Sequence, residues 1–447
     1  MLRKTLCGLA AAACIMAAPA VAEPNLKVPV TEFTLNNGLH VILHEDHTVP
    51  IVHTNIWYRV GSANEEKGKT GFAHLFEHLM FEGSGHVQEG EFDTLLESAG
   101  GNNNASTSKD RTNYYISIPS GSLDLPLFLE SDRMGFLLDS MSKDIVNEQR
   151  DVVKNEMRQS YLNRPYGVLW LELPQIMYPE GHPYHHPVIG SMEDLDAAGY
   201  DDVAGFFRKF YVPGNACLVV AGDINPKEAK EKIEKWFSDV KPGDPVPVVK
   251  AEPVAFGGIV KKEVTDKVEL PLRLCAWHTP AVLEKGDADL DVISFILAGS
   301  KNSRLYKRLV YEEQIAQSVS ASQMSSRLSS IFAIDFIPRP GHTIDEIQKA
   351  VDEEVARLAK EPPAAKEIEL ALNALKTETY RNLEKCAAKA DQLNAYYTYT
   401  GTPDYFQADL DRYSSVTPES IMETVRTWLP LDRRAELTVL PEKEAEK

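Results

Sequence analysis

Two histidines and a glutamate lie within five positions of one another, in the segment His74-Leu75-Phe76-Glu77-His78. On a helix, residues four positions apart share one face, so both imidazoles can offer a nitrogen to the same metal ion. Glu77 follows His74 by one turn, which allows its carboxylate to act as a base toward a water beside that metal. The order H-x-x-E-H is the inverted form of the usual zinc-peptidase motif. We therefore expect Zn²⁺ at His74 and His78, with Glu77 as the catalytic base.

The neighbours of this motif predict a largely buried helix over residues 71–82, because most of them are apolar. They are Phe72, Leu75, Phe76, Leu79, Met80 and Phe81. Buried imidazoles and a buried carboxylate need polar partners, and a metal ion supplies them. A pair of histidines on the exposed surface of a helix is the alternative interpretation.

A third metal ligand is expected elsewhere in the first half of the chain, because a catalytic zinc takes three protein ligands and keeps one position open. A long helix predicted over residues 144–162 offers Glu148 and Glu156. Val152 and Val153 precede Glu156 by four and three positions, so this glutamate borders an apolar face. The residues alone leave both glutamates open.

The elements around the motif predict an α+β fold. Residues 32–35 and 39–43 alternate in polarity around Asn36-Asn37-Gly38, which predicts a hairpin, and residues 51–60 and 114–118 predict further strands. Because strands and helices do not alternate strictly, we expect an antiparallel-rich sheet with helices on one face.

Internal similarity predicts a duplicated chain. Residues 74–84 and 290–300 both form an apolar segment closed by Gly-Ser, and residues 210–220 and 427–439 both place a proline between a helix and a strand. We therefore expect an N-terminal zinc-binding domain over residues 23–240 and a homologous domain without metal over residues 256–447. The Pro-rich segment 241–255 is predicted to link them.

The first 22 residues have the pattern of a secretory signal peptide, with a basic start, an alanine-rich apolar stretch and cleavage predicted after Ala22. No later segment is apolar for the 18 or so residues that a membrane span needs. The net charge of −19 disfavours non-specific nucleic-acid binding, because phosphate repels an acidic chain. Cys217, Cys275 and Cys386 remain after cleavage, and we expect all three to be small buried residues.

Several motifs together resemble the pitrilysin-type inverzincins, the family of insulin-degrading enzymes and mitochondrial processing peptidases. The resemblance spans nearly the whole chain after residue 22 and is carried by residues 74–78, 100–107, 150–156, 182–184 and 211–216. In this family the distal zinc ligand is a glutamate just under 80 residues after the second histidine, which implies Glu156. A further acidic residue often precedes that ligand by seven positions. Gln149 stands there in this chain, so Glu148, one position out of register, is the candidate for a supporting role.

The resemblance also implies two similar α+β halves that face each other around a chamber. In the second half, Leu290, Ile293 and Ser294 replace the two histidines and the glutamate of the motif, so only the first half is expected to bind metal. Residues 103–107 match the edge strand to which a peptide substrate adds. Asn104, Ala105 and Ser106 are therefore expected to bind the substrate, together with Phe81.

The second half departs from the family at an Arg and a Tyr, seven residues apart, that help to hold the substrate in active members. Alignment places Val310 and Gln317 at these positions. Some two-chain members divide the work, with zinc in one subunit and the Arg/Tyr pair in its partner. The resemblance thus implies an exported, periplasmic zinc metalloendopeptidase of the shorter bacterial group, acting on unstructured peptides as the zinc-bearing subunit of a heterodimer. A self-sufficient homodimer and a non-catalytic, chaperone-like zinc-binding subunit are the alternatives.

Overall fold

The computed structural model describes residues 25–442, which form two β-sheets with helices packed on them. The predicted signal peptide, residues 1–22, lies outside these residues. The first sheet has the order β1-β2-β6-β3-β5-β4. Its strands are β1 (Thr31–Thr34), β2 (His40–Glu45), β3 (Ile51–Tyr58), β4 (Asn102–Thr107), β5 (Thr112–Pro119) and β6 (Ala216–Gly222). The second sheet has the order β7-β11-β8-β10-β9. Its strands are β7 (Val260–Asp266), β8 (Leu272–Thr279), β9 (Ala316–Met324), β10 (Ser330–Pro338) and β11 (Ala435–Pro441).

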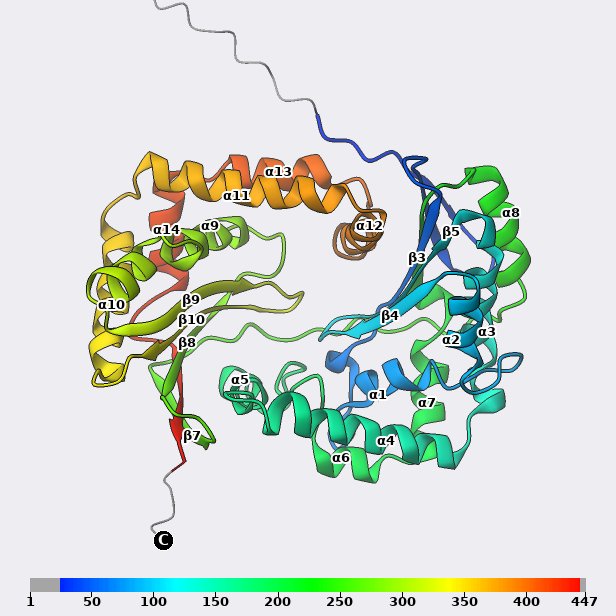
Figure 1. The fold of residues 1–447 in the computed structure, drawn as a ribbon, viewed down its shortest axis with the longest axis horizontal. Helices are drawn as coiled ribbons and strands as arrows, with labels where there is room; N and C mark the ends of the chain where they lie inside the picture. The colour runs from blue at the N-terminus through cyan, green and yellow to red at the C-terminus, as the bar shows by residue number, and fades with distance from the viewer. Residues whose placement is uncertain (1–24, 443–447) are drawn as a thin grey trace, which may run out of the picture.

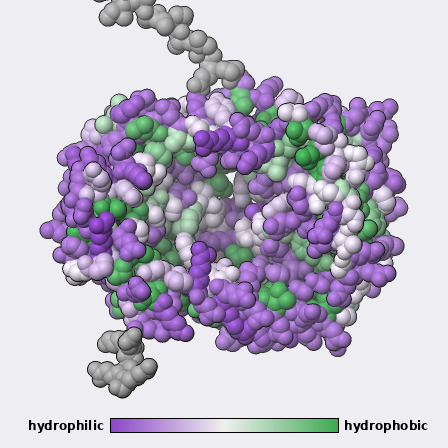
Figure 2. Space-filling model, in the orientation of Figure 1, coloured by the Kyte–Doolittle hydropathy of each residue, from purple (hydrophilic) through white to green (hydrophobic). Residues whose placement is uncertain are grey.

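The two sheets share one topology once β1 is set aside. Each contains a single parallel pair, β2 with β6 and β7 with β11, and every other described pair is antiparallel. The predicted hairpin is present as β1 and β2, paired antiparallel. In Figure 1 the two halves face each other, and Figure 2 shows a hollow between them bordered largely by hydrophilic residues. The prediction of two similar, antiparallel-rich α+β halves is confirmed.

Helices cover both sheets. Those of the first half are α1 (Phe72–Leu79), α2 (Glu91–Ser98), α3 (Asp124–Ser140), α4 (Lys143–Met157), α5 (Val168–Met177), α6 (Met192–Ala197), α7 (Tyr200–Phe210) and α8 (Pro226–Phe237). Those of the second half are α9 (Asp287–Ala298), α10 (Ile344–Lys360), α11 (Ala365–Leu383), α12 (Cys386–Thr400), α13 (Phe406–Ser414) and α14 (Pro418–Trp428). The helix predicted over 71–82 is shorter in the structure, whereas the helix predicted over 144–162 is matched by α4 and the π-helix Arg158–Leu162 that continues it.

One helix of each half packs on the sheet of the other half (Figure 1). The helix α12 packs on β3 and β6, where Ala390 and Leu393 join a buried cluster with Ile42 and Val219. In the other direction, α5 packs on β7, β8 and β11, and contributes Leu169, Leu173 and Met177 to a second buried cluster. A sheet with apolar residues on both faces needs a cover on each side. The exchange of α5 and α12 therefore joins the halves through their hydrophobic cores.

The segment between the halves, residues 241–255, contains neither helix nor strand. None of the helices in residues 25–442 combines the length and the apolar character that crossing a bilayer requires. Cys217 and Cys275 are buried free thiols, as expected. The expectation was wrong for Cys386, which is only half-buried at the start of α12, with its sulfur 3.7 Å from a carboxylate oxygen of Asp46.

Candidate metal centre

The start of α1 is fixed by a buried carboxylate. Glu65 accepts hydrogen bonds from the backbone N–H groups of Gly71 (2.9 Å) and Ala73 (2.8 Å), which satisfies two of the free donors at the N-terminus of the helix. The other partner of Glu65 is His186, with Nε2 at 2.8 Å. Gly71 has φ of 90°, and a Cβ there would lie 2.7 Å from the carbonyl oxygen of Ile189. Glu65 thus sets where the helix with the histidine motif begins, a role that sequence reasoning missed.

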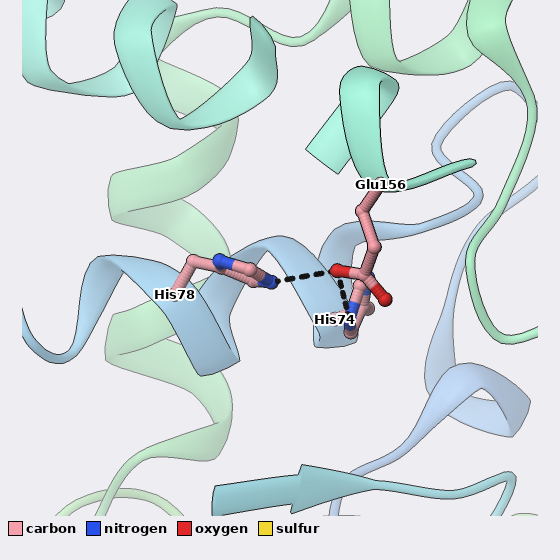
Figure 3. Close-up of side chains that lie close together, drawn as sticks. All are labelled: His74, His78 and Glu156. Carbon is pink, nitrogen blue, oxygen red and sulfur yellow. Dashed lines mark ion pairs between the residues drawn. The ribbon is translucent and has the colours of Figure 1, made fainter. Parts of the chain in front are cut away.

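One face of α1 brings the predicted ligands together. His74 Nε2 and His78 Nε2 lie 3.5 Å and 3.4 Å from the same oxygen, Oε2 of Glu156. Figure 3 shows both imidazoles directed at this carboxylate, which reaches α1 from α4. The three ligand atoms lie within 4.8 Å of one another, and they form the one such group found among the described residues. The structure therefore selects Glu156 over Glu148 as the third member of the cluster.

The charges of these side chains suit a divalent cation. Burial lowers the pKa of His74 to about 4, so its imidazole is neutral at pH 7. The hydrogen bond with His78 holds the pKa of Glu156 below its usual range, so its carboxylate is ionised. Two imidazoles and one carboxylate are a known catalytic ligand set for zinc. The residues present thus fit Zn²⁺, with His74, His78 and Glu156 as its ligands.

Glu77 lies beside this cluster and is held by β4. Its Oε2 accepts a hydrogen bond of 2.6 Å from the hydroxyl of Thr107, the last residue of that strand. Burial raises the pKa of Glu77, and the bond from Thr107 partly opposes this shift. Thr107 lies in the segment matched to the edge strand, but the sequence gives no sign of this contact, because Glu77 lies 30 residues away. Glu77 is thereby positioned as a proton acceptor next to the two histidines.

The strand β4 is an edge of the first sheet and pairs with β5 alone. In the turn between β4 and β5, the N–H of Ser108 donates to the carbonyl of Arg111. Because hydrogen-bonded and non-hydrogen-bonded residue pairs alternate along two antiparallel strands, this bond determines which residues of β4 are bonded to β5. This register directs the backbone N–H and C=O groups of Asn103, Ala105 and Thr107 away from β5, toward the open edge. The N–H of Ala105 meets the side-chain oxygen of Asn104 at 2.8 Å. An added peptide would find its backbone partners on this edge.

The other residues predicted for the site, Phe81, Ser106 and Glu148, differ in burial and in their contacts. Phe81 is half-buried and packs edge-on against Phe92, with ring centroids 5.4 Å apart. Ser106 is half-buried on β4. Glu148 is exposed on α4, outside the metal cluster, and Gln149 donates a hydrogen bond of 2.7 Å to Glu82.

The second half has no counterpart of the metal cluster within the described residues. Its helix α9 corresponds to α1, and Leu290 and Ile293 are fully buried there. Val310 is half-buried and Gln317 is exposed on β9. Two arginines that precede Val310 are held by carboxylates: Arg304 pairs with Glu367, and Arg308 pairs with Glu313, Glu353 and Glu354. A third, Arg339, lies against this segment and donates to the backbone carbonyls of Val310 (3.3 Å) and Ala316 (3.1 Å).

A buried carboxyl on α9 predicts a pH-dependent stability. Burial raises the pKa of Asp291 to about 7, against a hydrogen bond of 2.8 Å from the Tyr413 hydroxyl. Because the folded state holds this proton more tightly than the unfolded chain, stability falls as pH rises from about 4 to about 7. Asp291→Asn removes the titration, and we expect its free energy of unfolding at pH 8 to exceed that of the wild type by about 2–4 kcal/mol. Urea unfolding at both pH values checks this.

At pH 4 the Asp291→Asn variant and the wild type should unfold at similar urea concentrations, because the wild-type carboxyl is then protonated in the folded state. Asp289→Asn, on the same helix, is the matched control for removing one negative charge from an acidic chain. An equal gain in both variants at pH 8 would assign the effect to net charge and contradict the role of Asp291.

Comparisons with known proteins agree with this fold. The family model described as Insulinase (Peptidase family M16) matches residues 40–181, and the one described as Peptidase M16 inactive domain matches residues 197–375. The zinc protease PqqE of Helicobacter pylori is 31% identical over 386 residues, which span 85% of this chain and 86% of that protein. The probable mitochondrial-processing peptidase subunit beta of Arabidopsis thaliana is 24% identical, over 84% of this chain and 72% of that protein.

Solved structures share the fold of this chain. The crystal structure of a protease from Helicobacter pylori has a TM-score of 0.87 and 27% identity, and the match covers 92% of this chain and all of that one. The periplasmic protease PqqL of Escherichia coli shares the fold, with a TM-score of 0.76 and 18% identity, over 92% of this chain and 47% of that one.

The duplicated fold and the similarity to relatives named zinc protease identify this chain as a zinc peptidase of the M16 fold. More particularly, the chain belongs to the insulinase family, peptidase family M16. The resemblance predicted from the sequence motifs is thereby confirmed.

Proposed function

We propose that this protein is an exported zinc metalloendopeptidase that hydrolyses peptide bonds in unstructured peptides. The observation that carries the proposal is the convergence of His74, His78 and Glu156 within 4.8 Å, with Glu77 beside them. When bound at these ligands, zinc supplies Lewis acidity that polarises a carbonyl and lowers the pKa of a water toward 7. The domain division at residues 23–240, 241–255 and 256–447 and export to the periplasm are parts of the same proposal.

In this mechanism Glu77 takes a proton from the attacking water and passes it to the leaving amine. Thr107 orients the Glu77 carboxylate through the hydrogen bond to Oε2. The peptide joins β4 as an added strand, so that its backbone pairs with the open edge at Ala105. Asn104 and Ser106 flank that position, and Phe81 lies near it as a further substrate contact. Glu148 gives the ligands at most weak support through its charge, because it is exposed on α4.

The partner is proposed from what the second half lacks. Val310 and Gln317 stand where an Arg/Tyr pair would hold the substrate, and Arg304 and Arg308 are engaged by carboxylates of their own half. We therefore assign this chain to the metal-bearing subunit of a heterodimer whose partner, of the same fold, supplies the pair. A homodimeric peptidase and a non-catalytic zinc-binding subunit are the competing candidates.

Hydrolysis of a quenched fluorescent, unstructured peptide by the zinc-loaded chain alone tests the proposal. With stoichiometric zinc we expect little turnover from the chain alone, and turnover when a partner subunit with the Arg/Tyr pair is added. Robust turnover by the isolated chain would overturn the need for a partner. Zinc binding without turnover in any pairing would overturn the peptidase and favour the non-catalytic subunit.

The open edge of β4 gives a second prediction, for Ala105→Pro. Proline removes the outward N–H that a peptide would use, yet edge strands tolerate it because no ladder bond of the sheet is lost. We expect KM for the peptide to rise about tenfold or more, since a backbone hydrogen bond and close approach are both lost. Steady-state kinetics of the chain paired with its partner subunit measures the change. Ala105→Gly keeps the N–H and is the matched control; a similar rise in KM for both variants would argue against backbone pairing at this residue.

A further inference from the structure

A carboxylate of the second half accepts hydrogen bonds from three buried side chains of the first sheet. Asp391 lies on α12, which packs across β3 and β6. Its Oδ1 accepts hydrogen bonds from Asn55 Nδ2 (3.2 Å), Trp57 Nε1 (3.1 Å) and Asn113 Nδ2 (3.3 Å). These three side chains are at most 4% exposed. Because a buried donor without an acceptor is costly, Asp391 satisfies groups that the first sheet cannot satisfy from solvent.

The same network continues from Asn113 to the edge strand β4. The side-chain oxygen of Asn113 accepts from Ser106 Oγ at 2.7 Å and from Arg111 Nη1 at 3.0 Å. Arg111 Nη1 also donates to the backbone carbonyl of Ser106 at 2.8 Å, while its guanidinium lies 5.1 Å from the ring centroid of Trp57. The Asn113 amide nitrogen donates to Asp391 and also to Asn55 Oδ1 at 3.2 Å, which leaves the amide oxygen turned toward Ser106 and Arg111. Because Asn55 in turn donates to Asp391, this carboxylate orients Asn113 both directly and through Asn55.

The two faces of β4 are held by different parts of the molecule. Side chains alternate along a strand, so Ser106 and Thr107 point to opposite faces. Thr107 contacts Glu77 on α1, and Ser106 contacts the network that ends at Asp391 on α12. Only β5 pairs with β4 in the sheet, so the other edge of β4 has no neighbouring strand to hold it. These side-chain contacts therefore stabilise the position of β4.

We propose that Asp391 is a positioning residue, through which the C-terminal half holds β4 in place for a peptide to join. Without this carboxylate the Asn113 amide nitrogen keeps only its bond to Asn55 Oδ1, and Asn55 itself loses its acceptor on Asp391. The acceptor that Asn113 offers to Ser106 and Arg111 is then held less firmly. The edge of β4 then loses its fixed position relative to Glu77. The consequence for substrate binding rests on the peptidase function proposed above, whereas the order of β4 itself does not.

Backbone amide exchange across residues 102–107 tests the order of β4 directly, in the full zinc-loaded chain. We expect exchange to be about tenfold faster in Asp391→Ala and only slightly faster in Asp391→Asn, which keeps an acceptor oxygen. Lys389→Ala is the matched control, because Lys389 lies on the same helix and pairs with Asp46 rather than with the network. Unchanged exchange in Asp391→Ala, or equal acceleration in Lys389→Ala, would overturn the proposal, since either result assigns Asp391 to helix docking alone.

Peptide affinity gives the functional half of the test. In a Glu77→Gln background, fluorescence anisotropy of a labelled unstructured peptide should show about tenfold weaker binding after Asp391→Ala. Ser106→Ala combined with Asp391→Ala should weaken binding no further, because both act through one network. Additive losses would overturn the coupling through Ser106. A Glu77→Gln parent that binds no peptide would overturn the proposed function, and the exchange measurement would still decide the role of Asp391.

Discussion

Glu77→Gln should abolish peptide hydrolysis while leaving the zinc content of the protein unchanged. Glutamine has nearly the same shape and can still accept the hydrogen bond from Thr107, but it cannot take a proton from water. A positioned general base contributes on the order of 10²–10⁴ in rate, so we expect kcat to fall roughly 10³-fold or more. Steady-state hydrolysis of a quenched peptide by the chain paired with its partner subunit, with zinc measured in the same sample, checks both parts of the prediction.

The matched control for this variant is Glu82→Gln, in the segment directly after α1. Glu82 accepts a hydrogen bond from Gln149 and is not among the ligands of the metal cluster, so its loss should change kcat by no more than about threefold. If Glu77→Gln hydrolysed peptide at the wild-type rate, the base would have to be another group. If it lost its zinc, Glu77 would belong to the metal cluster instead.

The part of the site that could be predicted is the part that one helix makes alone. His74 and His78 converge because a helix brings residues four positions apart onto one face, and this needs no knowledge of the rest of the fold. Glu156 was one of two candidates from the residues and was favoured by the family resemblance. Choosing it from spacing alone would require knowing how α4 crosses α1, which depends on packing between elements about 80 residues apart.

The fold shows the same division between local and long-range information. The hairpin of β1 and β2 follows from a local turn and was predicted, and the repeat of helix, proline and strand revealed the duplication. The exchange of α5 and α12 between the halves was not predicted. Asp391 meets Asn55 across 336 residues of sequence, and a contact of that kind leaves no periodic pattern in either segment. The exposed side of Cys386 escaped prediction for the same reason, because its neighbour Asp46 lies 340 residues away.

Glu156→Gln should remove zinc and activity together. The carboxylate supplies the one negative charge of the ligand set, and both imidazoles already converge on its Oε2. A neutral amide is a much weaker ligand for Zn²⁺ than a carboxylate. We expect the zinc affinity to fall by about 10²-fold or more and turnover at limiting zinc to be lost. Competition with a fluorescent chelator measures the affinity without reference to activity.

Glu148→Gln separates this assignment from the alternative that the sequence left open. The two glutamates lie eight positions apart on α4, but Glu148 is exposed and stands outside the cluster. A role through charge alone, at that exposure, is worth little, so Glu148→Gln should change zinc affinity by less than about threefold. Residues eight positions apart lie on nearly the same side of a helix but about 12 Å apart along its axis. Loss of zinc from Glu148→Gln with retention in Glu156→Gln would therefore mean that α4 meets the histidines about two turns nearer its start when the metal is bound. The pair of variants thus tests both the third ligand and the packing of α4 on α1.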